Sequence, residues 1–486
     1  MQKFTTNTFQ AILPDVVSRY PENKALGFVG ESHLTYRQML EQTDAVVAFM
    51  EQLGVEPGDR VAIFSQNMPN WALVYLATQM MGVVVVPVLP DFNAAELENV
   101  LNHSGSKVLF ISESLRLKYE DIETNEVKAV VRLNDFTCLD KDKQSPVFDP
   151  TLKSSGKYSI DEDALSVLIY TSGTTGNSKG VMLSQKNLII NTMQAGEVQP
   201  ILPGERFLSV LPLSHTYENT LGLILPLLSG ATVTYLKKPP AAPVLLPALK
   251  EVRPHYMLTV PMLIEKVFRN SILPGINRSP VTKSLYNFTL TNGLICRLAG
   301  KKLMKTFGGR VKFFGIGGAK LDINVEKFLR KAKFPYAIGY GLTETSPLLA
   351  GSNPSNTSLQ AIGKEVEECE IKINNPDQQT GEGEIWAKGP NIMLGYYKDP
   401  ERTQEVMTSD GWFKTGDLGR FDKKGRLSHK GRLKNMIIGP NGENIYPEEI
   451  ESVINNFPHV VESLVVEKHG RLTALVHFNR EEIEEK

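Results

Sequence analysis

The 486-residue sequence has few cysteines and no excess of charge of either sign. Its three cysteines lie far apart and form no Cys-x-x-Cys pair. This argues against a disulfide framework or a zinc site and favours a reducing compartment. The 53 lysines and arginines and the 54 aspartates and glutamates leave a formal net charge of −1. We therefore expect no nucleic acid or other polyanion as a partner.

Long apolar segments are also scarce. The first ten residues, MQKFTTNTFQ, contain no apolar signal core. The most apolar run, residues 73–89, is interrupted by Gln79, Gly82 and Pro87. A helix followed by a buried strand explains it better than a membrane span. No amphipathic basic helix stands out that would predict stable membrane binding. We expect a cytoplasmic protein with at most peripheral contact at the inner face of a membrane.

The chain is too long for a single core, and its pattern changes along its length. Strands alternate with helices over roughly the first hundred residues and again later, which predicts parallel sheets covered on both faces. After residue 361 short strands and turns predict antiparallel pairing. The expected elements are strands at 60–65, 83–88 and 107–112, helices at 70–81, 94–105 and 322–332, further alternation at 206–236 and 310–340, a hairpin turn at 422–425, a helix from Pro447 and two strands joined at 469–471.

A loop rich in glycine and hydroxyl groups lies in LIYTSGTTGNSKGVML, residues 168–183. Glycines let a backbone approach a ligand, hydroxyls add donors and Lys179 adds positive charge, a combination that suits a polyphosphate. A Walker A loop fits poorly because Lys179 is preceded by Ser178, followed by Gly180, and then by a predicted strand. A flexible linker is the remaining alternative, although such linkers are rarely flanked by apolar segments on both sides.

Six motifs in order carry a resemblance that covers nearly the whole chain. The motifs are YTSGTTGNSKGV (170–181), GIGGAKL (315–321), GYGLTE (339–344), GEIWAKGPNIMLGYY (383–397), WFKTGDLG (412–419) and GRLKNMIIGPNGENIYPEEIE (431–451). With these motifs the sequence resembles the adenylate-forming superfamily of acyl-CoA synthetases, luciferases and peptide-synthetase adenylation domains. The segments GYGLTETSP and NGENIYPEEIE are most similar to those of bacterial long-chain fatty acid–CoA ligases.

The resemblance implies an α/β fold with two mixed, largely parallel αβαβα layers and a distorted antiparallel β-barrel. It divides the chain into a large domain at 1–432, with αβ subdomains to about 360 and a β-rich part at 361–432, and a small α+β domain at 433–486. Lys434 falls at the hinge between the two domains. The family's second catalytic lysine lies well beyond this hinge and finds no counterpart, so we expect a truncated chain that binds ATP but adenylates poorly.

The implied reaction joins a fatty acid to ATP, releases pyrophosphate, and passes the acyl group from AMP to CoA. ATP, CoA and Mg²⁺ are the expected small molecules. An enzyme that loads an acyl or aryl group onto a carrier protein, or a non-catalytic nucleotide-binding homologue, stays open as an alternative.

The resemblance also assigns residues, each with a plainer alternative. Glu344 would bind Mg²⁺ with Thr171, because a carboxylate beside phosphates needs a cation between them. Tyr340 could instead be a core residue, Asp417 a turn residue, His215 a structural histidine and Lys434 a solvated side chain. The expected phosphate clamp is Thr171, Ser172, Gly173, Thr174, Thr175, Gly176 and Lys179; the adenine slot is Gly317, Gly318, Ala319, Gly339, Tyr340 and Gly341; Thr343 would contact the α-phosphate, Asp417 the ribose, Arg432 the ribose or phosphate, and His215 would lie near the acyl carboxyl group.

The scarcity of ionisable side chains in residues 207–236 indicates the polarity of the acyl group. Besides tyrosines, residues 207–236 contain only His215 and Glu218 as ionisable side chains. No aspartate stands there to pair with the amine of an amino acid. This favours an uncharged apolar tail, and the resemblance alone favours a long one.

Overall fold

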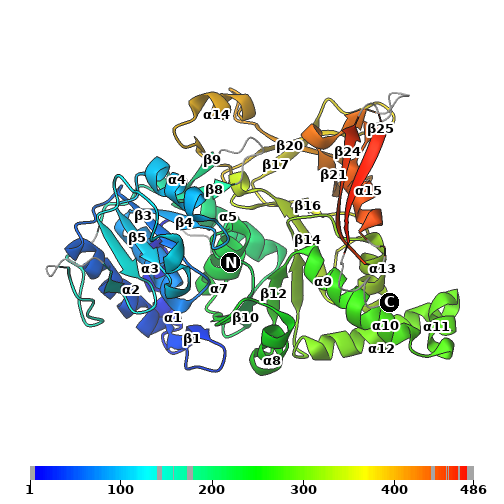
Figure 1. Ribbon diagram of the computed structural model, residues 1–486, viewed down its shortest axis with the longest axis horizontal. Coiled ribbons are helices and arrows are strands. Elements are labelled where there is room, and N and C mark those ends of the chain that lie inside the picture. The colour runs from blue at the N-terminus through cyan, green and yellow to red at the C-terminus, as the bar shows by residue number, and fades with distance from the viewer. Residues whose placement is uncertain are drawn as a thin grey trace.

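Two large mixed sheets and the helices around them make up most of the molecule (Figure 1). The computed structural model describes residues 6–139, 145–156, 158–171, 179–438, 444–455, 457, 459–468 and 471–478.

The first sheet has nine strands in the described residues, and its six central strands run parallel to one another. Its two outer edges are antiparallel. The strands, in sheet order, are β16 (Lys364–Glu365), β15 (Leu348–Gly351), β14 (Tyr336–Gly341), β13 (Phe313–Ile316), β12 (Tyr256–Thr259), β10 (Arg206–Ser209), β11 (Thr232–Tyr235), β1 (Lys24–Phe28) and β2 (Leu34–Thr35).

The second sheet has eight strands in the described residues, and the five in its middle are parallel. The strand that begins at Lys179 pairs antiparallel on both of its sides, which carries the end of the glycine-rich loop to this edge of the sheet. The strands, in sheet order, are β19 (Gly395–Tyr396), β9 (Lys179–Ser184), β8 (Leu165–Thr171), β4 (Val84–Val88), β3 (Arg60–Phe64), β5 (Val108–Ile111), β6 (Ala129–Arg132) and β7 (Thr137–Cys138).

Helices cover both faces of both sheets, so the expected αβαβα layering is confirmed. Alternation along the strands shows this: Val61 of β3 packs into a central core shared by the two sheets, while Ala62 packs into an outer one. The central core includes α1 (Phe9–Arg19), α2 (Tyr36–Gln52), α3 (Pro69–Met81), α5 (Gln185–Val198) and α7 (Leu225–Leu228), and the outer cores include α4 (Ala94–Ser104), η1 (Glu113–Lys118), α8 (Ala242–Val252) and α13 (Ile323–Ala332).

Local signals in the sequence set several element boundaries as predicted. Gly105 ends α4 in the left-handed conformation with φ of 65°. Asn93 and Glu96 form a capping box at the start of the same helix. Asp322 caps α13 by accepting hydrogen bonds from the backbone N–H groups of Asn324 and Val325. The predicted helices and strands of the first hundred residues are confirmed within a residue or two.

The β-rich part forms an open antiparallel sheet rather than the expected distorted barrel, because its last strand pairs elsewhere. The backbone N–H of Ile362 donates to the carbonyl of Leu427, and the N–H of Leu427 donates to the carbonyl of Gly363. This edge therefore joins the residues that directly precede β16 of the first sheet. The predicted turn at 422–425 is confirmed. The strands are β17 (Glu370–Asn374), β18 (Gly383–Lys388), β20 (Phe413–Phe421) and β21 (Leu427–Arg432), with α14 (Pro400–Val406) between the middle two.

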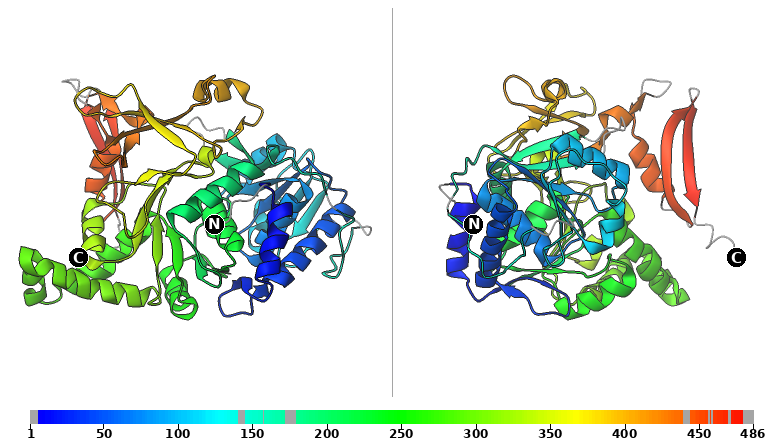
Figure 2. Two further views of the ribbon diagram at one scale, coloured as in Figure 1. Left: turned by 180° about the vertical axis from the view of Figure 1, so that it is seen from behind. Right: turned by 60° about the vertical axis from the view of Figure 1, so that its left-hand side comes forward.

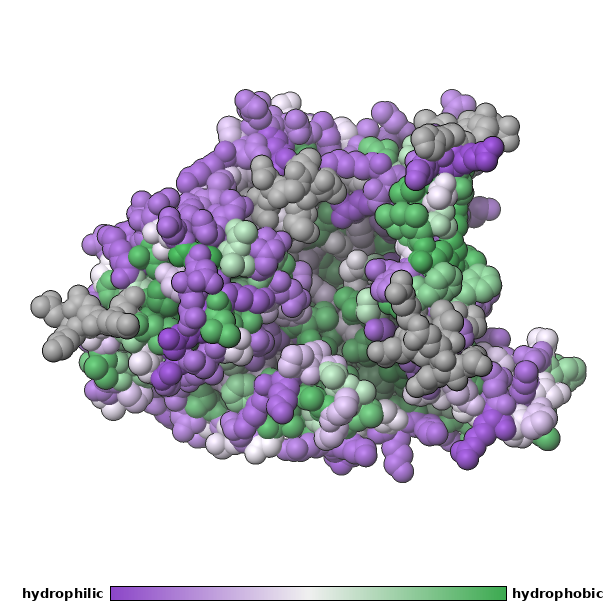
Figure 3. All heavy atoms as spheres, in the orientation of Figure 1, coloured by the Kyte–Doolittle hydropathy of each residue, from purple (hydrophilic) through white to green (hydrophobic). Residues whose placement is uncertain are grey.

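The chain beyond Arg432 forms a small unit whose hairpin stands beside the rest of the molecule (Figure 2). Apolar side chains gather on the face of this unit seen in Figure 3, and Leu464 and Leu475 are among the exposed ones. The division at 432/433 stays a prediction. The elements are η5 (Leu433–Asn435), β22 (Ile437–Ile438), β23 (Asn444–Ile445), α15 (Pro447–Ile454), β24 (Val460–Lys468) and β25 (Arg471–Phe478).

A helical arm is inserted between the neighbouring strands β12 and β13 and projects from the body (Figures 1 and 2). No helix within the described part of the chain is both long and apolar enough to cross a membrane. The arm consists of α9 (Pro261–Val267), η3 (Phe268–Ile272), α10 (Leu273–Asn277), α11 (Pro280–Asn287) and α12 (Thr289–Thr306).

Among the buried carboxyl groups, that of Glu218 has a strongly raised pKa. Glu218 ends the short helix α6 (Thr216–Glu218), before the π-helical η2 (Asn219–Ile224). Its side chain is 2% exposed, and Oε2 has no hydrogen-bond partner among the described residues. Burial raises the pKa of Glu218 from 4.5 to about 8, against a smaller opposing effect of Ser209.

This carboxyl group predicts a pH dependence of stability. Between about pH 4.5 and pH 8 the folded chain keeps a proton on Glu218 that the unfolded chain has released. The free energy of unfolding should therefore fall as pH rises through this window, by up to about 1.4 kcal/mol per pH unit from this group. Urea unfolding should show that Glu218→Gln removes this slope, while the exposed control Glu365→Gln retains it. Parallel curves for all three proteins would contradict the prediction.

Candidate active site

Three segments that are far apart in the sequence meet at Glu344. This residue lies in the short 3₁₀ helix η4 (Thr343–Thr345) just after β14, and its side chain is buried. Lys179 Nζ donates to Glu344 Oε1 at 2.5 Å and to the Tyr396 hydroxyl at 2.8 Å. The Tyr396 hydroxyl in turn donates to Glu344 Oε1 at 2.8 Å. The lysine charge offsets that of a carboxylate that would otherwise be costly to bury.

Strand pairing explains why these groups meet. Lys179 is the first residue of β9, and Tyr396 lies in β19, which pairs with β9. The Glu344 carbonyl accepts from the backbone N–H of Met393, which fixes η4 against the segment before β19. Burial and the nearby Glu344 carboxylate raise the pKa of Tyr396, so this hydroxyl stays protonated. Its role was missed from the sequence, although it lies within a motif, because a tyrosine there is equally well explained by packing.

The glycine-rich loop begins and ends at this cluster. Thr171 and Lys179 are direct partners in the antiparallel pairing of β8 and β9. Thr171 Oγ1 is buried and has no hydrogen-bond partner among the residues described. The expected clamp residues between them, Ser172, Gly173, Thr174, Thr175 and Gly176, lie outside the described residues.

A second polar cluster forms at the carboxyl end of β14. The Tyr340 hydroxyl donates to Asp417 Oδ2 at 2.8 Å. Asp417 Oδ1 lies 2.9 Å from Arg432 Nε and 3.8 Å from His429 Nε2. Asp417 and Arg432 face each other across β20 and β21. Burial and the Asp417 charge raise the pKa of Tyr340 well above its usual value, so the ring stays neutral.

Glycines around Tyr340 permit close approaches of the backbone. A Cβ atom at Gly341 would lie 1.7 Å from the carbonyl oxygen of Pro347, so no larger residue fits without moving the backbone. Gly339 would place a Cβ 3.2 Å from Leu348. The space beside Tyr340 is thus bordered by backbone.

The other predicted residues are placed as follows. Gly317 follows β13 and would place a Cβ 3.2 Å from the ring of Tyr217, while Gly318 has φ of 83° and, like Ala319, is exposed. Thr343 lies in η4 next to Glu344 and within three residues of Tyr340, between the two clusters. Lys434 lies exposed in η5.

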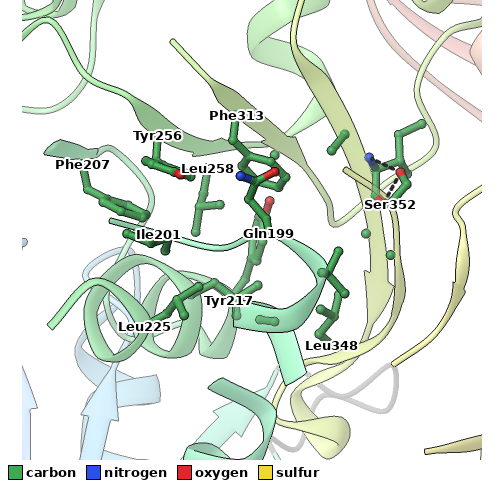
Figure 4. A pocket seen from close by; sticks show the side chains of 18 residues that line it. Gln199, Ile201, Phe207, Tyr217, Leu225, Tyr256, Leu258, Phe313, Leu348 and Ser352 are labelled. Atoms are coloured by element: carbon green, nitrogen blue, oxygen red, sulfur yellow. Dashed lines mark hydrogen bonds between the residues drawn. The ribbon is translucent and has the colours of Figure 1, made fainter. Parts of the chain in front are cut away.

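An apolar cavity of about 60 Å³ reaches the edge of the Tyr340 cluster at Gly339 (Figure 4). It lies between the end of α5, the η2–α7 segment and strands β10 to β15. None of its lining residues carries a formal charge at neutral pH. The residues that line it include Gln199, Phe207, Tyr217, Leu221, Leu258 and Phe313.

His215 does not line this cavity. It is exposed and directly precedes α6. The same segment reaches the cavity two residues later through Tyr217, which also packs against Gly315 and Gly317. An aromatic side chain in an apolar context gave no signal in the sequence that would separate a lining residue from a core residue.

Glu344 and Thr171 offer oxygen atoms, the kind of ligand that Mg²⁺ prefers. The described residues contain no group of three or more histidine, cysteine, aspartate or glutamate side chains that could hold a metal ion. Mg²⁺ binds through one or two protein oxygens, with phosphates and water completing its shell. The buried Glu344 carboxylate and the unpartnered Thr171 hydroxyl provide such a pair, so the residues fit this ion.

Known proteins of similar structure share the fold. The O-succinylbenzoate coenzyme A synthetase of Bacillus subtilis in complex with AMP has a TM-score of 0.77 at 24% identity, covering 96% of this chain and 88% of that one. The ATP-bound MatB of Rhodopseudomonas palustris has a TM-score of 0.77 at 23% identity, covering 97% and 89%.

Curated relatives are similar in sequence along most of the chain. The fatty acyl-CoA synthetase A of Dictyostelium discoideum is 29% identical over 458 residues, which are 87% of this chain and 68% of that protein. The long-chain-fatty-acid–CoA ligase FadD15 of Mycobacterium bovis is 29% identical over 89% of this chain and 75% of its own length.

The model of the AMP-binding enzyme family matches residues 13–397, well over half of the sequence. The predicted resemblance is thereby confirmed: the chain belongs to the AMP-binding enzymes, the adenylate-forming family that includes acyl-CoA synthetases.

Proposed function

We propose that this protein is an ATP-dependent ligase that activates a long-chain fatty acid as its acyl adenylate, releases pyrophosphate and transfers the acyl group to CoA. The observation that carries the proposal is the convergence of Lys179 and Glu344 at one end of a short segment whose other end, Tyr340, adjoins an uncharged cavity. Charged groups and an apolar cavity are thus separated by the few residues around Thr343.

Each cluster has a role in this proposal. Tyr340 offers a neutral flat face to adenine, and Asp417 offers carboxylate oxygens to the ribose hydroxyls, with Arg432 beside them. Lys179, at the end of the glycine-rich segment, would contribute positive charge toward the phosphates. Along the chain Thr343 lies between Tyr340 and Glu344. The α-phosphate and the acyl carboxyl group would meet beside it. Bringing these two anions together is the step that positioned positive charge must assist.

Glu344 and Thr171 would hold Mg²⁺ in this arrangement. Bound at this point, the ion would offset the negative charge of the phosphates. Lys179 already neutralises Glu344, so the carboxylate is held in place and oriented by the lysine and by Tyr396.

The cavity supports an apolar acid. Glu218, the acidic side chain of the segment 207–236, is buried away from the cavity lining. No lining residue can therefore pair with the amine of an amino acid substrate. Of the curated relatives at about 29% identity, one is named a fatty acyl-CoA synthetase and another a long-chain-fatty-acid–CoA ligase, and the second name supports the longer fatty acids. Measuring the thiol that accepts the acyl group separates CoA from a carrier protein.

The nucleotide half of the proposal is tested with Glu344→Gln. The substitution keeps the shape and the bonds to Lys179 and Tyr396 but removes the charge. Pyrophosphate exchange should fall by about a hundredfold or more, and thermal melting checks that the variant is folded. Glu326→Gln removes another fully buried carboxylate, bonded to Tyr336, and should leave exchange intact. Equal exchange by wild type and Glu344→Gln would refute the role. ATP binding without exchange in wild type would fit both the non-catalytic alternative and the poor adenylation expected from the sequence, and exchange by a C-terminally extended chain would separate the two.

The acyl half is tested with Leu221→Trp, which places a larger side chain into the cavity. Activity with long-chain acids should fall about tenfold or more relative to medium-chain acids, because each methylene excluded from an apolar pocket loses its burial. AMP and acyl-thioester formation across a panel of acids measures this shift. The exposed Leu202→Trp, outside the cavity, should keep the wild-type profile. A uniform loss across all chain lengths would contradict the assignment.

A further inference from the structure

The helical arm (residues 261–306) has a charge distribution unlike that of the whole chain. From residue 266 to residue 321 the sequence contains eleven lysines and arginines but no aspartate or glutamate. The whole chain is nearly neutral, with a net charge of −1. The flanking acids are engaged locally, since Glu265 pairs with Arg269 and Asp322 caps α13. The arm is therefore a local concentration of positive charge.

Eight of these cations are exposed and make no ion pair within the described part of the chain, and seven of the eight lie on the arm. Ion pairs that neutralise surface charge are common elsewhere in the molecule, as with Arg132 and Asp135. The positive charge of these arm side chains is therefore not neutralised by neighbouring carboxylates. The seven are Lys266, Arg278, Lys283, Arg297, Lys301, Lys302 and Lys305.

Large apolar side chains are exposed on the same arm. On α12 Leu290, Leu294 and Leu298 are 84%, 60% and 56% exposed, and on the preceding turn and helix Phe288 and Val281 are 57% and 67% exposed. Each of these side chains leaves apolar surface in water without a compensating contact. Exposed apolar residues gathered at the tip of a projecting element indicate an interaction surface.

Helical periodicity places the two kinds of side chain side by side. Leu290, Leu294 and Leu298 follow one another at intervals of four residues, so they form a row along α12. Arg297, Lys301 and Lys305 form a second row with the same interval, and Lys301 lies three residues from Leu298. The two rows share one side of the helix. The leucines occupy the half near the tip and the cations the half near the body.

The other side of α12 is packed against the body. Cys296 and Leu303 are 0% and 3% exposed, and a Cβ added at Gly300 would lie 2.7 Å from Ala332 of α13. The helix is thus anchored by one face while it presents the other. The sequence showed no amphipathic basic helix strong enough to predict stable membrane binding, and that expectation stays a prediction, although α12 carries leucines and cations on one exposed side.

We propose that the face of α11 and α12 formed by these leucines and cations docks on a membrane surface that carries anionic lipids. Leucine side chains at the tip would enter the boundary between headgroups and acyl chains, and the lysine and arginine heads would remain at the level of the lipid phosphates. An acidic protein or a nucleic acid would match the charge but would leave the exposed leucines in water. The inference does not depend on which acid the site activates.

Vesicle flotation of the full chain tests the proposal. Vesicles of phosphatidylcholine in which about a third of the lipid is replaced by phosphatidylglycerol should bind the protein, pure phosphatidylcholine vesicles should bind it at least about tenfold less, and added salt should release it. Arg297→Gln/Lys301→Gln/Lys305→Gln and Leu290→Ser/Leu294→Ser/Leu298→Ser should each weaken binding about tenfold or more.

Matched controls change the same residue types elsewhere on the exposed surface. They are Lys128→Gln/Lys423→Gln/Lys424→Gln and Leu117→Ser/Val147→Ser/Leu202→Ser, and both should bind vesicles like wild type. Thermal melting checks that every variant is folded. Equal binding by arm variants and controls would overturn the proposal, as would no vesicle binding by wild type. Binding to heparin that the leucine substitutions leave unchanged, without vesicle binding, would identify a general polyanion surface instead.

Discussion

The contact between Lys179 and Glu344 joins the parts of the molecule on which everything else in the site depends. It connects the edge of one large sheet to the segment that follows β14 of the other sheet, 165 residues later in the chain. Tyr396 closes the contact into a triangle, so each group orients the other two. Because Thr171 is the strand partner of Lys179, both ends of the glycine-rich loop are fixed beside this carboxylate.

Much of the fold was predictable because, in those segments, the residues that favour a helix, a strand or a helix end stand where the tertiary structure places that element. Valine-rich runs are buried strands, Gly105 ends its helix, and Asp322 begins one. The open four-stranded sheet was not predictable, because it depends on where Leu427 finds its backbone partners. Pairing between strands that are distant in the sequence leaves little trace in either one.

The candidate site shows the same division. Polar residues inside motifs, such as Glu344 and Asp417, could be singled out because the motifs that contain them resemble those of the family. Aromatic residues could not be singled out in this way, because Tyr396 and Tyr217 are equally well explained as core side chains. Only the structure shows that Tyr396 contacts Glu344 and that Tyr217 lines the cavity. The sequence also singled out His215 for its chemistry; its side chain is exposed and lies outside the cavity lining, so its role stays a prediction. Burial and direction are tertiary properties, which one sequence does not encode residue by residue.

The close approach at Gly341 has a consequence for how such a site can change over time. With a carbonyl oxygen where a methyl group would stand, this position tolerates no substitution unless β14 and β15 separate. The surface beside Tyr340 is therefore formed by backbone atoms, whose positions depend little on the side chains nearby. Diversification of the enzyme is then confined to the opposite end, where Leu221, Leu225 and Phe207 can be exchanged for larger or smaller neighbours. The backbone around Gly341 is thus constrained by close packing, whereas the side chains that line the cavity can change in size, and the acids that the cavity would accept would change with them.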